Sequence, residues 1–185
     1  MGTPKEHNIF DQLVPFFQRQ FNSIRLCLGN DHLLSACILL FSTVDSLAAL
    51  HRHQHNADVT REDFKSWCNL YLVNFLKTKC TGEDLYGARC GVLHTSTAES
   101  SRSRQQEAKQ IYYFAEEHPV NNKIPGIVKK SSIAPDFLTI ELYNFLEALE
   151  KGTCEFFVDV KGKTDKVKLI EERCQKLLTL GFLAT

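Results

Sequence analysis

The chain has no net charge. Among its 185 residues, 22 Lys and Arg residues face 22 Asp and Glu residues, so the formal net charge at pH 7 is zero. Domains that bind nucleic acid over a long stretch are usually basic over at least one face. The neutral balance removes the simplest argument for nucleic-acid binding, and any such function has to rest on a local site.

The sequence also lacks a Cys-x-x-Cys pair, although it contains seven cysteines. That absence and the odd number argue against a secreted disulfide framework and against a zinc ribbon. The first seven residues, Met-Gly-Thr-Pro-Lys-Glu-His, contain no apolar signal core. These features predict a cytoplasmic protein whose cysteines are mostly small core residues.

Several catalytic signatures are missing. The chain has no Gly-rich phosphate loop, no Gly-x-Ser-x-Gly elbow and no His-Glu-x-x-His motif, and we expect no cofactor. No membrane association is expected either. Residues 33–50 are mostly apolar but contain Asp45, and a carboxylate near the centre of a spanning helix costs about 2.5–3.5 kcal/mol. This segment is better explained as the buried central helix of a soluble bundle.

The composition that remains, 43% apolar and 24% charged residues, is typical of one soluble domain over residues 1–185. Apolar residues recur at the spacing of one helix face in several segments. Thr60 with Asp63, and Thr81 with Asp84, have the spacing of capping boxes that begin helices. The segments with helical periodicity are 9–24, 32–54, 64–75, 138–149 and 167–178.

A smaller part of the chain predicts other structure. Two short segments, 110–115 and 155–160, have strand-like composition and could pair with each other. Residues 96–104 are predicted to form a polar loop, and residues 118–135, which hold three of the five prolines, an irregular segment. We therefore expect a mostly α-helical bundle in residues 1–104, followed by a small β element and further C-terminal helices in residues 105–185.

One charged residue stands where the helical pattern calls for an apolar one. Leu85, Ala88 and Val92 form an apolar stripe, and Arg89 follows Leu85 by four residues, so it lies on that stripe. Arginine rarely faces a core unless it is paired. The most economical partner is Asp45, the lone acid of the apolar second helix. A purely structural, partly buried ion pair explains both residues.

His94 adds a second interpretation. A guanidinium binds phosphate in bidentate fashion, and an imidazole exchanges protons near neutral pH. Together they suit phosphodiester cleavage without a metal, with the histidine moving the proton of a 2′-hydroxyl or of the leaving oxygen. Positions five apart lie about 140° apart around a helix. Arg89 and His94 therefore converge only if the helix ends at the motif, or if two subunits face each other across it.

The segment Arg89-Cys-Gly-Val-Leu-His94 is an Arg-x4-His motif, and it resembles the signature of HEPN domains, in particular the group typified by plasmid-encoded HEPN proteins. The apolar helix with Asp45 and the aromatic pair Tyr112 and Tyr113 fit that family. The resemblance implies an up-and-down helical bundle that forms a homodimer and cleaves RNA in toxin–antitoxin or antiviral systems. It further implies that Arg89 and His94 are catalytic and that the products carry 2′,3′-cyclic phosphates and 5′-hydroxyls.

Other residues are candidates for supporting roles. Tyr86 and Tyr112 could stack on unpaired bases, and Arg102 and Arg104 could hold RNA phosphates. The alternatives are burial of the tyrosines and a solvated loop for the arginines. The run His51-x-His53-x-His55 could offer two metal ligands, but a polar helix end is the simpler explanation, and we predict no metal site.

Three hypotheses follow. The first is a metal-independent endoribonuclease of HEPN type, in which Arg89 binds the scissile phosphate, His94 transfers the proton and Asp45 orients Arg89. The second is a non-catalytic module of the same fold that binds a nucleotide or a partner protein, such as an antitoxin. The third is a structural dimer in which Arg89 and Asp45 form only a buried pair.

Overall fold

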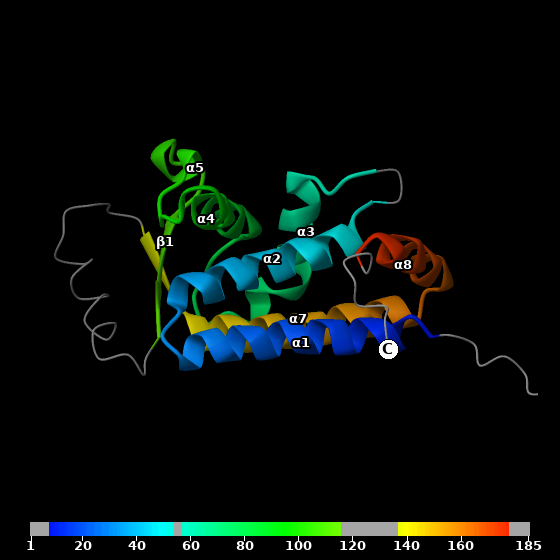
Figure 1. Cartoon of the computed structure of the whole chain (residues 1–185). Helices are drawn as coiled ribbons and strands as arrows, with labels where there is room; N and C mark the ends of the chain where they lie inside the picture. Colours follow the sequence, from blue (N-terminus) through cyan, green and yellow to red (C-terminus); the bar gives the residue numbers. More distant parts are fainter. Residues whose placement is uncertain (1–7, 54–56, 116–136, 178–185) are drawn as a thin grey trace, which may run out of the picture.

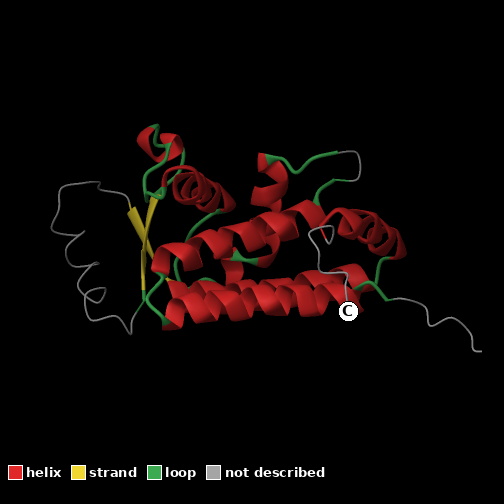
Figure 2. Cartoon of the chain, viewed as in Figure 1, coloured by secondary structure: helices red, strands yellow, loops and turns green. Residues whose placement is uncertain are grey.

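A computed structural model of the chain describes residues 8–53, 57–115 and 137–177. These residues form helices and one two-stranded sheet, so the expected mostly α-helical fold is confirmed (Figure 2). The elements in chain order are α1 (Phe10–Gly29), α2 (Leu33–His51), α3 (Arg61–Tyr71), the 3-10 turn η1 (Val73–Phe75), α4 (Gly82–Thr95), α5 (Ser101–Arg104), β1 (Gln110–Phe114), β2 (Phe137–Glu141), α7 (Leu142–Lys161) and α8 (Thr164–Leu177).

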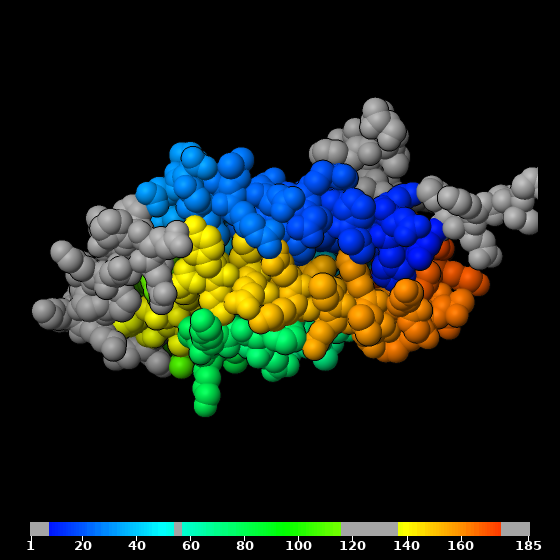
Figure 3. Space-filling view, turned by 90° about the horizontal axis from the view of Figure 1, so that it is seen from below, coloured from blue at the N-terminus to red at the C-terminus, as the bar shows by residue number. Residues whose placement is uncertain are grey.

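Two long helices, α1 and α7, run side by side along the length of the molecule, and α2 packs on both (Figures 1 and 3). Helices α3 and α4 pack on α2 and on each other. Helix α8 lies at one end of the molecule, whereas α5 and the two strands lie at the other end, beside α4 (Figure 1). This arrangement makes α2 the central helix of the bundle.

Helix α2 is long and apolar enough to cross a membrane by length and composition, but half of its most apolar window is buried within the protein. It contacts α1, α3, α4, α7 and α8. Leu40, Phe41, Val44 and Leu47 are fully enclosed. A helix with partners on this many sides is the core helix of a bundle, as the position of Asp45 within it suggested.

Both predicted capping boxes are confirmed. At the start of α3 the Thr60 hydroxyl accepts from the Asp63 backbone N–H, and the Asp63 carboxylate accepts from the Thr60 N–H. Thr81 and Asp84 make the same reciprocal bonds at the start of α4. Each box satisfies two backbone donors that a helix start leaves unpaired, which fixes where these helices begin.

The β element differs from the prediction. Strand β1 pairs with β2 in parallel, with Gln110 opposite Phe137 and Phe114 opposite Glu141. The predicted partner, residues 155–160, is wrong because this segment lies within α7. Phe156 and Val160 stand four residues apart on the buried face of that helix, whereas Val158 is 75% exposed. The apolar residues at 156, 158 and 160 resembled the alternation of a strand. In the helix, positions 156 and 160 share one face and position 158 lies on another.

Two further segments depart from expectation. Leu138, assigned to a helix by periodicity, belongs to β2, and α7 begins only at Leu142. Residues 101–104 of the predicted polar loop form the short helix α5, which begins with a Ser100 cap. The predicted irregular segment 118–135 lies outside the described residues.

Helix α7 contributes one buried face to the core of the bundle. It packs against α1, α2 and α3, and its face is enclosed at Phe145, Leu149 and Phe156. At Gly152 the backbone of Tyr71 approaches so closely that a Cβ atom would lie 2.0 Å from the Tyr71 carbonyl oxygen. Only glycine permits this approach between α7 and the end of α3.

The cysteines follow the expectation in part. All seven are free thiols, and Cys37, Cys68 and Cys174 are buried. Burial raises the pKa of Cys37 and of Cys174 to about 12, so both thiols are protonated and behave as small apolar groups. Cys27, Cys80 and Cys90 are half-buried, and Cys154 is exposed on α7.

Candidate functional site

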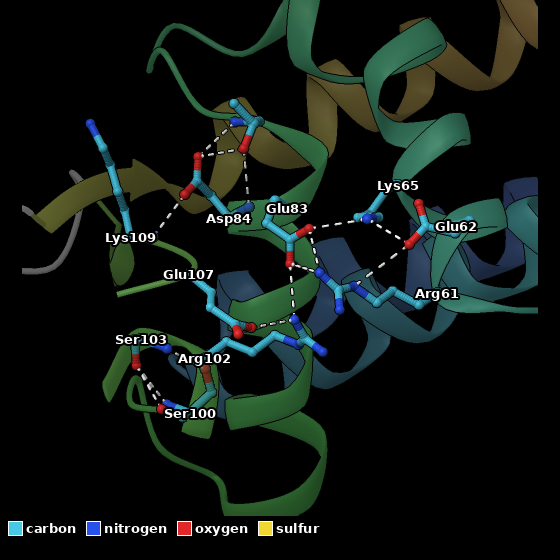
Figure 4. A network of polar contacts seen from close by, with 11 residues as sticks. Arg61, Glu62, Lys65, Glu83, Asp84, Ser100, Arg102, Ser103, Glu107 and Lys109 are labelled. Carbon is cyan, nitrogen blue, oxygen red and sulfur yellow. Dashed lines mark hydrogen bonds and ion pairs between the residues drawn. The ribbon is translucent and has the colours of Figure 1, made fainter. Parts of the chain in front are cut away.

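The first turn of α4 is anchored by a network of ion pairs around Glu83 (Figure 4). The Glu83 carboxylate accepts hydrogen bonds from Arg61 at 2.7 Å and Lys65 at 3.1 Å on α3, and from Arg102 at 3.3 Å on α5. The neighbouring Asp84 carboxylate also accepts from the Lys109 backbone N–H at 2.7 Å. These bonds tie α4 to α3, α5 and the start of β1, and so fix the helix that carries the motif.

One and a half turns further along α4, Arg89 forms the predicted ion pair with Asp45 of α2. The Nε atom lies 3.1 and 3.2 Å from the two Asp45 oxygens, and Nη2 lies 2.9 Å from Oδ2. One edge of the guanidinium therefore forks onto one carboxylate, the strongest geometry for this pair. The side chains are 23% and 26% exposed, so the pair sits at the surface of the core and is reachable by solvent.

The other edge of the guanidinium faces His94. Arg89 Nη1 lies 3.4 Å from His94 Nε2, although the residues are five apart in sequence. Helix α4 ends at Thr95, and Ser96 follows in the left-handed region with φ 54°. The helix thus stops at the motif, which is one of the two conditions expected for the side chains to converge within one subunit.

Burial and charge act against each other at this pair. Burial by itself lowers the pKa of Arg89, but the hydrogen bonds and negative charge of Asp45 more than offset it, and the pKa lies above its ordinary value. Burial raises the pKa of Asp45, while the hydrogen bonds and charge of Arg89 and the charge of His94 oppose that rise. The arginine therefore stays cationic at any pH at which the protein is folded.

Gly91 lets the chain after α4 fold back against the motif. The Thr97 N–H donates to the Gly91 carbonyl, and the Thr95 hydroxyl donates to the same oxygen at 2.8 Å. A Cβ atom on Gly91 would lie 2.7 Å from the Thr97 carbonyl oxygen and 2.9 Å from that of Glu99. A larger residue at this position would push residues 97–99 away from the helix.

This return creates an open depression of about 390 Å³ beside His94. Its wall combines the end of α4, the loop that follows and the start of α5. The depression is lined by Cys90, Gly91, His94, Thr95, Thr97, Glu99, Ser100, Ser101 and Arg104. It is therefore rich in hydroxyl groups and holds one carboxylate and one guanidinium.

The structure brings only some of the predicted supporting residues to this place. Arg104 lines the depression with His94. Arg102 instead bonds Glu83 and Glu107, and its guanidinium lies 5.4 Å from the centre of the Tyr86 ring. Tyr86 also packs edge-on against Phe64. Arg102 and Tyr86 thus belong to the network around Glu83, on the side of α4 that faces α3.

Tyr112 lies on β1, with its ring edge-on to Phe137 of β2 at 5.7 Å between centroids. Its neighbour Tyr113 is half-buried and packs against the core, and its buried hydroxyl has no hydrogen-bond partner among the described residues. The aromatic pair therefore contributes to the sheet and the core.

The histidine-rich end of α2 lies away from the motif. His51 packs edge-on between Tyr71 and Phe156, and burial lowers its pKa. His55 lies outside the described residues. Two larger hollows, about 790 and 550 Å³, flank His51 and Lys166 near α8. Nowhere in the described ranges do three His, Cys, Asp or Glu side chains gather closely enough to hold a metal ion.

Sequence reasoning missed Gly91, Thr97 and Glu99. The sequence signal for Gly91 was present, since a glycine inside a helix often marks a close backbone approach. For Thr97 and Glu99 no signal was available. Their position depends on the left-handed turn at Ser96, a conformation that a serine adopts rarely.

The site can hold an anion and exchange a proton. A fixed guanidinium edge and an imidazole nitrogen, both from the second half of α4, face each other beside an open depression. No family model, no curated protein and no solved structure matches this chain. The chemistry of Arg89, Asp45 and His94 is therefore what points to a function.

Proposed function

We propose that the protein is a metal-independent endoribonuclease of HEPN type, with Arg89 and His94 as its catalytic residues and Asp45 as a positioning residue. One observation carries the proposal. Asp45 holds the guanidinium by Nε and Nη2, and Nη1 is left facing His94 Nε2 at 3.4 Å. A structural ion pair alone does not require a histidine at the free edge.

The reaction that this arrangement favours is internal transesterification. The ribose 2′-oxygen forms a bond to phosphorus, its proton passes to His94 Nε2, and the bond from phosphorus to the 5′-oxygen breaks. The Nη1 edge of Arg89 offsets the negative charge that grows on the non-bridging oxygens. The leaving 5′-oxygen takes up a proton from a second histidine, which a homodimer supplies across a composite cleft. The products are a 2′,3′-cyclic phosphate and a 5′-hydroxyl.

The Arg-x4-His motif on a helical bundle supports a HEPN relationship, and with it a cytoplasmic role in a toxin–antitoxin or antiviral system with an antitoxin or other protein as partner. RNA is the proposed substrate. The neutral chain suits a short contact with RNA around the scissile phosphate, since tight binding of long nucleic acid needs many basic contacts.

A non-catalytic nucleotide-binding module is the second candidate. It is favoured by the fact that Asp45 already occupies the Nε and Nη2 edge on which an arginine binds phosphate in bidentate fashion. A phosphate then meets one guanidinium arm instead of two, which suits modest binding without strong stabilisation of a transition state.

Incubation of the purified protein with single-stranded RNA in the presence of EDTA separates these functions. The proposal predicts cleavage that leaves cyclic phosphates and that is lost in Arg89→Ala and His94→Ala. Arg25→Ala, which breaks an arginine–glutamate pair on α1 and α7, and His32→Ala on an exposed turn are the matched controls. Both controls should cleave like the wild type.

The other outcomes discriminate as well. Saturable nucleotide binding without cleavage, lost in Arg89→Ala, would support the binding module. Equal cleavage by the wild type and both motif variants would trace the activity to a contaminant and overturn the proposal. If no cleavage and no ligand binding are found, and Arg89→Ala only lowers stability, then Arg89 and Asp45 form a purely structural ion pair.

A further inference from the structure

We propose that the depression beside His94 is a base-specific subsite that takes a guanine, with Glu99 and Arg104 reading the base; this inference rests on the proposed function. The depression opens directly at the His94 ring. Its volume of about 390 Å³ falls within the range of about 300–1,000 Å³ typical of small-molecule sites. If the scissile phosphate lies at Arg89, this depression is the nearest hollow for the base of an adjoining nucleotide.

The wall of the depression carries two opposite charges that are only loosely engaged with each other. Arg104 Nη1 lies 3.7 Å from Glu99 Oε2, and the two side chains are 59% and 53% exposed. An exposed pair at this distance contributes little to stability. The Glu99 carboxylate and the Arg104 guanidinium can therefore turn to a ligand with little loss of free energy. Arg102 differs, because it pairs with both Glu83 and Glu107.

The two charges sum to zero, so the pair offers a bare anion no net attraction. It suits a ligand that presents hydrogen-bond donors on one edge and acceptors on another. Thr97 and Ser101 also line the depression, and the Ser101 hydroxyl can donate to a ligand or accept from it. Among the components of RNA, a nucleobase has this mixed character.

The four bases differ in how well they fit. Guanine offers two adjacent donors, N1–H and the 2-amino group, to a carboxylate, and its O6 and N7 accept from an arginine. Cytosine and adenine each bring one amino donor next to a ring acceptor, which would face the carboxylate unfavourably. Uracil places its single N3–H between two carbonyl oxygens. The expected preference is guanine first, cytosine and adenine next, and uracil last.

Residues 97–99 are held in place by contacts that keep the subsite open. The Thr97 hydroxyl donates to the Glu99 carbonyl oxygen at 2.8 Å and meets the Thr95 hydroxyl at 2.7 Å. The Ser100 hydroxyl caps α5 by accepting from the Ser103 N–H, which fixes the helix that carries Arg104. The two reading side chains therefore project from a bonded framework.

The test uses the full-length protein in two arms. In the first, a randomised single-stranded RNA pool is cleaved in EDTA and the 5′-hydroxyl ends are sequenced. We expect guanine enriched about tenfold or more at one position flanking the cut, and that enrichment lost in Glu99→Gln and in Arg104→Gln. Glu147→Gln, an exposed glutamate on α7, is the control that keeps the preference.

In the second arm, binding of GMP, AMP, CMP and UMP to the full-length protein, without RNA, is measured by calorimetry. GMP should bind most tightly, and Glu99→Gln should reduce that binding to the level of AMP. Cleavage without base preference would overturn the subsite and leave the ribonuclease standing. No cleavage, together with selective GMP binding, would overturn the ribonuclease and leave the subsite. Equal binding of the four nucleotides would overturn the subsite in either case.

Discussion

Helix α4 takes part in two ionic clusters, one in its first turn and one in its second half, and the charges of the two clusters are balanced differently. At its start, one carboxylate, Glu83, is shared by Arg61, Lys65 and Arg102. In its second half, Arg89 has a single carboxylate partner and turns its other edge to His94. The first cluster uses its charges to join three helices, whereas the second leaves one guanidinium arm beside an open depression. This difference separates a structural network from a candidate active site.

The largest expected difference between the clusters is in RNA cleavage. Arg89→Ala and His94→Ala should each lower the rate by about 10²–10⁴-fold, because they remove the charge stabilisation and the proton transfer. Glu83→Gln should stay within a few-fold of the wild type. Initial rates on a labelled single-stranded RNA measure both. If Glu83→Gln costs as much as Arg89→Ala, the distinction between the two clusters fails.

A smaller effect is expected from the residue that positions Arg89. Asp45→Asn keeps the shape of the side chain but loses its charge, so the guanidinium is held less firmly. We expect kcat to fall about 10–100-fold with a smaller change in KM, since a small misplacement of a reacting group has effects of this size. Asp11→Asn on α1 is the control. A change in KM alone would argue that Asp45 acts on substrate binding.

The predictable part of the site was the part set by local sequence. Helical spacing placed Arg89 on the apolar stripe, and the need of a buried arginine for a charged partner pointed to Asp45. That contact is confirmed. The capping boxes at Thr60 and Thr81 were readable because their bonds join residues three apart. The depression was not predictable, because it depends on a left-handed residue at Ser96 and on the return of the chain over Gly91.

The β element shows the same limit. The composition of residues 110–115 predicted a strand, and β1 (Gln110–Phe114) lies there, but its partner is set by tertiary packing. Phe156 and Val158 read equally well as strand or helix over so short a window, and the buried face of α7 decided between them. Local pattern therefore predicted strand β1, but neither its partner nor the type of an element as short as residues 155–160.

The cluster around Glu83 should show its role in stability. Glu83→Gln removes the charge that three cations share, and we expect the free energy of unfolding to fall by about 1–3 kcal/mol, as for other hydrogen bonds to charged groups. Urea titration measures this, with Glu147→Gln as the exposed control, whose loss should be too small to resolve. If the free energy of unfolding of Glu83→Gln equals that of the wild type, the cluster around Glu83 does not contribute to stability.

Acid should weaken the same cluster. Burial raises the pKa of Glu83, but the hydrogen bonds from Arg61 and Lys65 outweigh that effect and the pKa lies below its ordinary value. The stabilisation is thus fully present above the unfolded-state pKa of about 4.3 and is lost as the pH falls through the lower folded-state pKa. The stability gap between the wild type and Glu83→Gln should shrink across this acid range. A stability gap that widens on acidification would contradict the lowered pKa of Glu83 in the folded protein.

The smallest effect concerns the depression. In Gly91→Ala the new Cβ would meet the Thr97 and Glu99 carbonyls, so the loop beside His94 has to shift. We expect a several-fold loss of cleavage, since the reacting groups move slightly. Gly29→Ala is the matched control, because a Cβ there meets nothing within 4 Å. Equal rates in the two variants would show that the return loop does not support the site.

The most direct test of the central claim is the cleavage rate of Arg89→Lys. Lysine keeps the positive charge beside Asp45 but lacks the planar arm that faces His94. If the arm acts on the phosphate, the folded variant should cleave RNA at least about 100-fold more slowly than the wild type. A lysine variant that cleaves at the wild-type rate would contradict the account, because charge at this position would then suffice.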